Sequence, residues 1–130
     1  MSTNKIVLDA SAMLALLHEE PGSEKLTIEM LRGSVTSAVN AAEVHTKLVA
    51  RGEDESDAWE DTLSAVGEVL PYTADQARVS GGLAKYTRSI GLSLGDRACL
   101  ALGLSLKAPV FTTDKAWKNL SVGLRIHVIR

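Results

Sequence analysis

The sequence predicts an α/β domain in which a short central parallel sheet is covered by helices on both faces. Two observations carry this prediction. Short apolar stretches alternate with helical segments along the whole chain. The 130 residues suffice for one domain with a real core but are too few for two. Residues 1–130 are therefore expected to form a single domain.

The first half of the chain predicts two strands and four helices. The apolar stretch KIVLDA is typical of a buried strand that ends at Asp9. A helix follows until the EPG turn, and a second helix is expected between Ser23, as its N-cap, and Gly33, as its stop. The expected strands cover residues 5–9 and 34–37, and the expected helices cover residues 11–20, 23–33, 37–52 and 55–69.

The second half continues the same alternation. One long helix is expected to be weakened by Gly81 and Gly82, because glycine is a poor helix former. The next helix is almost entirely apolar after Arg97, which indicates that it is buried. Extended stretches are expected over residues 68–72, 108–114 and 124–129, helices over 73–91 and 93–107, and a short helix or turn over 114–120.

Four carboxylates lie where a strand leads into a helix or in the first turns of a helix. Asp9 ends the first strand, and Asp114 ends the stretch VFTTD. Asp96 opens the apolar helix, and Glu43 lies in the second turn of the helix after the second strand. Parallel sheets bind ligands beyond the carboxyl ends of their strands. The sequence thus places these acids on the side where a site is expected.

Each acid also has a purely structural interpretation. Asp9 and Asp114 suit the N-caps of the segments that follow them. Asp96 lies three residues after Ser93, so SLGD fits a capping box. Glu43 is past the first turn, where capping is weak, but Lys47 lies four residues on and could pair with it on an exposed face.

The four acids together favour a metal site. Two carboxylates about 5 Å apart would repel by roughly 3 kcal/mol at an effective dielectric near 20. Without a cation some of them would have to hold protons, with raised pKa values. A divalent ion removes this conflict, and an all-oxygen ligand set favours Mg²⁺ or Mn²⁺ over zinc. Such an ion can activate water to attack a phosphodiester.

Charge and composition narrow the function further. The net charge of −2 is unlike that of a protein that holds nucleic acid by phosphate contacts alone. A nucleic-acid enzyme of this composition would need a bound cation, a local basic rim or a partner. The N-terminal stretch is not expected to act as a signal peptide, and no apolar run is long enough to span a membrane. Cys99 is the only cysteine and is expected to be buried as a small hydrophobic residue. A cytoplasmic protein with no membrane partner is expected.

Four short stretches resemble the PIN-domain ribonucleases, and most closely the VapC-type toxins of bacterial toxin–antitoxin pairs. They are VLDASAMLALLHEEPG, TSAVNAAEVHTKL, GLSLGDRACLAL and PVFTTDKAW, which occur in the order of the family and extend over nearly the whole chain. Each stretch is weak alone, but the four at this spacing are quite specific.

The resemblance implies a PIN fold over residues 1–130 and a metal-dependent endoribonuclease that cleaves tRNA or another structured RNA. The acids Asp9, Glu43, Asp96 and Asp114 would hold one or two Mg²⁺ or Mn²⁺ ions. Ser11 and Thr112 match small hydroxyl positions that support the acids, and Asn40 lies one helical turn before Glu43, where it can orient it. The family also implies a homodimer and a cognate VapB-type antitoxin that blocks the site.

Two basic residues follow acids of the expected site. Arg97 and Lys115 could hold RNA phosphates or be ordinary surface charges, and Lys118 suits a surface charge better. The three histidines show no ligand spacing, and Trp117 is expected in the core.

The main alternative function is that of a catalytically silent PIN-like module that binds RNA or protein. A receiver domain lacks its paired early acids here, and a Rossmann domain lacks GxGxxG. A histidine ribonuclease would differ in leaving a 2′,3′-cyclic phosphate.

Overall fold

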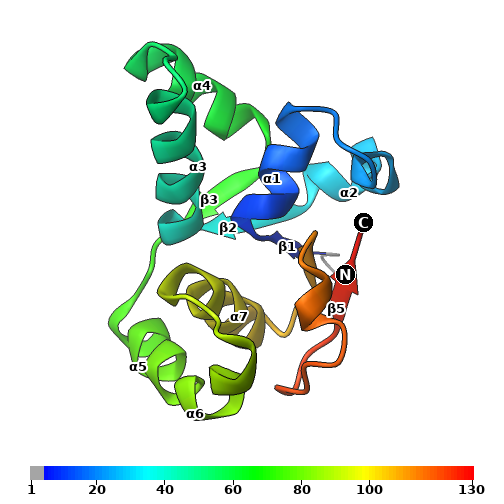
Figure 1. The fold of residues 1–130 in the computed structure, drawn as a ribbon, viewed down its shortest axis with the longest axis vertical. Helices are drawn as coiled ribbons and strands as arrows, with labels where there is room; N and C mark the ends of the chain where they lie inside the picture. The colour runs from blue at the N-terminus through cyan, green and yellow to red at the C-terminus, as the bar shows by residue number, and fades with distance from the viewer. Residues whose placement is uncertain (1–4) are drawn as a thin grey trace.

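The computed structural model describes residues 5–130, which form a five-stranded, fully parallel sheet with helices on both faces (Figure 1). The strand order is β3-β2-β1-β4-β5, so β1 lies in the centre. The strands are β1 (Ile6–Leu8), β2 (Ser34–Ser37), β3 (Glu68–Leu70), β4 (Val110–Thr112) and β5 (Ile126–Val128). All five lie within the stretches predicted from the sequence, and each is as long as predicted or shorter.

Seven α-helices and three short 3₁₀ helices are described in residues 5–130. The α-helices are α1 (Ala10–Leu17), α2 (Ile28–Arg32), α3 (Ala38–Ala50), α4 (Glu55–Ser64), α5 (Ala74–Gly82), α6 (Ala84–Thr87) and α7 (Leu94–Leu106). The 3₁₀ helices are η1 (Ser23–Lys25), η2 (Arg88–Ile90) and η3 (Lys115–Trp117). No helix among the described residues is long and apolar enough to span a bilayer.

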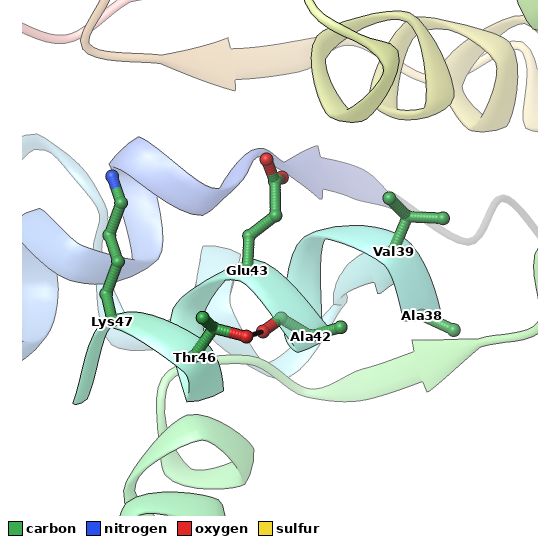
Figure 2. Close-up of a pocket in the computed structure, with 6 residues that line it drawn as sticks. All are labelled: Ala38, Val39, Ala42, Glu43, Thr46 and Lys47. Atoms are coloured by element: carbon green, nitrogen blue, oxygen red, sulfur yellow. Dashed lines mark hydrogen bonds between the residues drawn. The ribbon is translucent and has the colours of Figure 1, made fainter. Parts of the chain in front are cut away.

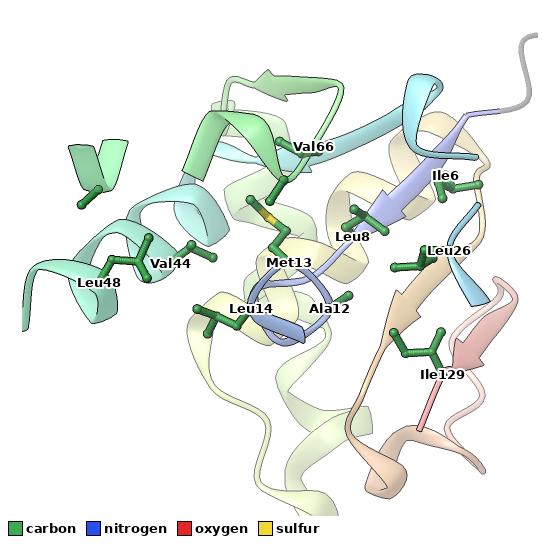
Figure 3. Close-up of a cluster of buried hydrophobic side chains, with 12 residues drawn as sticks. Ile6, Leu8, Ala12, Met13, Leu14, Leu26, Val44, Leu48, Val66 and Ile129 are labelled. Atoms are coloured by element: carbon green, nitrogen blue, oxygen red, sulfur yellow. The ribbon is translucent and has the colours of Figure 1, made fainter. Parts of the chain in front are cut away.

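The sheet separates two hydrophobic clusters, because successive strand residues point to opposite faces. Ile6 and Leu8 of β1 join a cluster with Met13 of α1 and side chains of α3 and α4 (Figure 3). Val7 joins the other cluster, which contains Leu100 of α7 and the fully buried Trp117. The predicted core positions of Cys99 and Trp117 are confirmed.

The helix predicted over residues 23–33 is wrong, since the segment forms η1 and then α2. Leu26 between them has an extended backbone and is buried in the first cluster. Thr27, not Ser23, caps the α-helix, and its hydroxyl accepts a hydrogen bond from the Met30 amide. Burial of Leu26 therefore overrides the helical pattern of this segment.

Two other predicted helices are shorter than expected. The helix of residues 55–69 ends at Ser64, because Gly67 must pass close to β2: a Cβ atom there would lie 2.7 Å from the Ser34 carbonyl oxygen. The segment 73–91 divides into α5, α6 and η2 after Gly81 and Gly82, where the sequence predicted a weak helix.

The site is expected where β1 and β4 lie side by side. From β1 the chain proceeds to β2 and β3 on one side, whereas β4 and β5 lie on the other. Doubly wound sheets bind ligands at the carboxyl ends of the strands where the strand order reverses. Asp9 and Thr112 lie at these two ends.

Candidate active site

Asp9 is the most enclosed of the four acids, at 4% exposed. It is the N-cap of α1, and its Oδ1 accepts hydrogen bonds from the Ser11 hydroxyl (2.7 Å) and the Ala12 amide (2.8 Å). Its Oδ2 accepts a hydrogen bond from the Thr112 hydroxyl (2.6 Å). The hydroxyls of Ser11 and Thr112 thus hold this carboxylate from two chain segments, as the resemblance implied for supporting residues.

The negatively charged form of the Asp9 carboxyl is disfavoured by its surroundings despite these hydrogen bonds. Burial raises the pKa of Asp9 from 3.8 to about 6, the hydrogen bonds from Thr112 and Ser11 oppose the rise, and the charge of Asp96 adds to it. Among residues 5–130 no lysine, arginine or histidine forms an ion pair with Asp9. A negative charge on Asp9 therefore has no compensating basic side chain among residues 5–130.

This environment makes stability depend on pH. The pKa of Asp9 is higher in the folded than in the unfolded chain, so protonation of Asp9 stabilises the folded state. This stabilisation is fully present below about pH 3.8 and is lost as the pH rises through about 6. Ionised Asp9 therefore costs on the order of 3 kcal/mol of folding free energy at neutral pH.

The Asp9→Asn variant is consequently expected to be more stable than the wild type at neutral pH, by about 1–3 kcal/mol, and to lose this advantage below about pH 4. Urea unfolding in a chelating buffer at both pH values measures the difference. An advantage that is the same at both pH values, or a loss of stability at neutral pH, would show that Asp9 is not destabilised by its charge.

Glu43 projects from α3 and lies against the first turn of α7. Its Oε1 accepts a hydrogen bond from Asn40 Nδ2 (2.8 Å), and the same amide donates to the Gly95 carbonyl (3.0 Å). Asn40 is 1% exposed, and its Oδ1 has no hydrogen-bond partner in the described part of the chain. Asn40 thus joins Glu43 to α7, which supports its expected orienting role.

Gly95 is a site residue that the sequence analysis missed. A Cβ atom on Gly95 would lie 2.4 Å from both Glu43 carboxylate oxygens. The carboxylate therefore occupies the space that any other side chain would need, next to Asp96. The glycine in SLGD could have been noted in the sequence, but its reason is a contact between two distant helices.

Asp96 is half-buried and completes the predicted capping box. Its Oδ2 accepts a hydrogen bond from the Ser93 amide (3.0 Å), and the Ser93 hydroxyl accepts one from the Asp96 amide (3.2 Å). The capping interpretation is confirmed for Asp96, and also for Asp9 and Asp114. Capping fixes these carboxylates without using both oxygens of Asp96 or Asp114.

Cys99 is buried in α7, one helical turn after Asp96. Burial raises the pKa of its thiol, and the charges of Asp9, Asp96 and Glu43 raise it further. Asp114 lies at the rim instead: it is exposed, and its Oδ1 caps η3 by accepting from the Ala116 amide (2.9 Å). The Asp114 amide donates to the Thr112 hydroxyl (3.1 Å), which links its backbone to Asp9.

The acids fit a divalent cation in chemistry but do not form a closed set of ligands. Across residues 5–130, no three histidine, cysteine, aspartate or glutamate side chains are grouped closely enough to hold an ion. The convergent acids do offer oxygens and no nitrogen or sulfur ligand, and none is neutralised by a basic side chain in this range. Such hard oxygen donors suit Mg²⁺ or Mn²⁺.

Basic residues near the acids lie in different directions. Arg97 is half-buried and donates a hydrogen bond from Nη1 to the Ser80 carbonyl of α5 (3.0 Å), and it forms no ion pair with a site acid. Lys47 and Glu43 leave the same side of α3 with their charged ends apart (Figure 2), and no ion pair joins them. Lys115 is exposed beside Asp114. RNA contacts by Arg97 and Lys115 stay predictions.

Glu43 also lines an open groove of about 620 Å³ along α3, together with Ala38, Val39, Ala42, Thr46 and Lys47 (Figure 2). Three of its lining residues, Ala38, Val39 and Ala42, are small and apolar, and the other three are Glu43, Thr46 and Lys47. Glu43 is therefore reachable from solvent on this side, whereas Asp9 is held beneath the surface.

Comparison with known proteins agrees with this architecture. The PIN domain family matches residues 6–123. No curated protein sequence matches the chain. The fold is similar to that of VapBC2 from Rickettsia felis bound to promoter DNA, with 17% identity, a TM-score of 0.71, and coverage of 94% of this chain and 96% of that chain.

Two proteins of Mycobacterium tuberculosis are also similar. VapC20, described as a sarcin–ricin loop cleaving toxin, has 20% identity, a TM-score of 0.72, and coverage of 92% of this chain and 98% of that chain. VapBC-5, a toxin–antitoxin system, has 24% identity, a TM-score of 0.61, and coverage of 98% of each chain. At these identities the similarity establishes a shared fold.

Proposed function

The chain belongs to the PIN domain family, and from this premise we propose that it is a Mg²⁺- or Mn²⁺-dependent endoribonuclease that acts as the toxin of a toxin–antitoxin pair. The observation that carries the proposal is the proximity of three acids: the Glu43 carboxylate lies against Gly95, the residue before Asp96, and the charge of Asp96 contributes to the raised pKa of the buried Asp9. No basic side chain of residues 5–130 is paired to these three carboxylates, which favours a cation-binding role over capping alone.

Asp9, Glu43 and Asp96 are the proposed metal ligands, with Asp114 joining them from the rim. A bound divalent ion would polarise the phosphodiester and lower the pKa of the attacking water. The chain's own residues prepare that chemistry. Ser11 and Thr112 hold Asp9 by hydrogen bonds, and Asn40 holds Glu43. The capping box keeps Asp96 at a fixed place on a buried helix.

A structured RNA is the proposed substrate, with tRNA as one candidate. A VapB-type antitoxin is the proposed partner, since several similar folds come from VapBC complexes. Homodimerisation is part of the same proposal. A nuclease of cellular RNA acts where that RNA is, so the proposed location is the cytoplasm.

One observation favours a second candidate, a catalytically silent module that binds RNA or protein. The described acids are not grouped as a ready-made ion site. The two candidates differ in whether divalent ions produce cleavage.

The proposal is tested by incubating the antitoxin-free protein with total cellular RNA, with Mg²⁺ or Mn²⁺ and with a chelator. Cleavage only in the presence of the ion, with 5′-phosphate and 3′-hydroxyl ends, is expected. Sequencing of the ends would identify the target. Cleavage that survives chelation or leaves 2′,3′-cyclic phosphates contradicts the metal mechanism, and no cleavage with either ion favours the silent module.

A further inference from the structure

A second groove, of about 550 Å³, lies between η3 and the edge strand β5. It is lined by Lys115, Lys118, Ile126, His127, Val128 and Arg130. Figure 1 shows this end of the sheet, where the orange segment after β4 lies beside the red strand β5. Of these residues, only Lys115 was predicted from the sequence as an RNA contact.

The groove concentrates positive charge on a chain whose net charge is −2. Arg130 is paired with Glu20 (2.5 Å), which fixes it at one end of the groove. Lys115 and Lys118 are exposed and have no ion-pair partner in residues 5–130. Two ammonium groups without an ion-pair partner can bind phosphate groups at the edge of this groove. They form the local basic rim that a chain of net negative charge needs in order to bind RNA.

The groove also contains an aromatic surface. His127 stacks on Phe111, with ring centroids 4.6 Å apart and an angle of 16° between the rings. The pair is set by the register of the sheet, in which Phe111 of β4 lies opposite His127 of β5. Phe111 is half-buried against the first core cluster and His127 is exposed. A ring held in this way can stack with an unpaired base.

The groove and the proposed site acids are linked through β4 and the residues that follow it. Thr112, next to Phe111, donates to Asp9, and Lys115, which lines the groove, follows Asp114 directly. This linkage places the groove beside the proposed cleavage site.

We propose that the groove between η3 and β5 binds single-stranded RNA next to the cleavage point, with Lys115 and Lys118 holding phosphates and His127 stacking on a base. This rests on the proposed function, because it assumes that RNA is the substrate. It adds a specific expectation about that substrate: the nucleotides beside the cut are unpaired.

Binding of a fluorescently labelled single-stranded RNA in a chelating buffer tests this groove without cleavage. Lys118→Gln is expected to bind about 3- to 10-fold more weakly and to lower the slope of affinity against salt by roughly one contact. His127→Ala is expected to bind about tenfold more weakly, and His127→Phe should restore binding by providing a ring. Lys107→Gln, on an exposed lysine at the opposite end of β4, is the matched control and should bind like the wild type.

The proposal is overturned if Lys118→Gln and His127→Ala bind as tightly as Lys107→Gln. It is also overturned if a double-stranded RNA of equal length or an acidic peptide competes as well as the single strand. Thermal melting of each variant separates loss of binding from loss of fold. Because no metal is present, failure here leaves the metal-dependent cleavage test unaffected, and normal binding without any cleavage would instead defeat the proposed function.

Discussion

Asp9→Asn is expected to lose at least about 100-fold in RNA cleavage while its fold becomes more stable at neutral pH. The substitution removes the charge of the most enclosed of the proposed ligands, and loss of several kcal/mol of transition-state stabilisation corresponds to this factor. The amide keeps the shape of the side chain, so the hydrogen bonds from Ser11 and the Ala12 amide to Oδ1 can persist.

Single-turnover cleavage at saturating Mg²⁺ measures this loss, and Asp75→Asn is the matched control. Asp75 is exposed in the first turn of α5, so its substitution should leave the cleavage rate unchanged. Asp9 would be only a structural cap if Asp9→Asn cleaved RNA at the rate of the control. The loss of cleavage distinguishes a ligand from a cap, because asparagine caps a helix about as well as aspartate and so preserves the structural role.

Gly95→Ala is expected to lower cleavage by about 10- to 100-fold without unfolding the protein. The new methyl group would lie 2.4 Å from both Glu43 oxygens, so the carboxylate must move away. A displacement of about 1 Å can slow an enzyme by up to about 100-fold. The helix itself should tolerate the change, because alanine is the better helix former by about 1 kcal/mol.

Gly81→Ala is the matched control, since a Cβ atom at Gly81 meets nothing within 4 Å. It should retain full activity. If Gly95 acts through Glu43, then adding Gly95→Ala to a Glu43→Ala variant should cost no further activity. If Gly95→Ala lowers cleavage equally in the wild-type and Glu43→Ala proteins, or leaves the wild-type activity unchanged, then Gly95 does not act through Glu43. The affinity for Mn²⁺ provides a second measurement, which should fall with Gly95→Ala and not with Gly81→Ala.

The sequence predicts the architecture well, because each strand carries its own local signal. The apolar stretch before Asp9 and the capping box SLGD depend on neighbours in the chain, and both are confirmed. The prediction of one helix over residues 23–33 is wrong for the opposite reason. Its helical pattern is local, but the burial of Leu26 depends on the other elements of the core.

The candidate site divides in the same way. The sequence predicts that Asp9, Asp96 and Glu43 lie on the same side of the sheet, because parallel sheets bind ligands at the carboxyl ends of their strands. The directions of individual side chains do not follow from sequence position. Arg97 adjoins Asp96 in the chain yet bonds to the Ser80 carbonyl, and the carboxylate of Asp114 turns to cap η3. Gly95 was missed because its role depends on a side chain 52 positions away, at Glu43.

The central claim is that Asp9, Glu43 and Asp96 hold the divalent ion that supports RNA cleavage. A crystal structure of the protein with Mn²⁺ tests it most directly, because the anomalous signal of Mn²⁺ locates the ion independently of activity. The account predicts an ion with oxygen ligands from at least two of these three side chains, at distances of about 2.1 Å, and its loss in Asp96→Asn. An absence of Mn²⁺ between these carboxylates, in a preparation that cleaves RNA, would contradict the account.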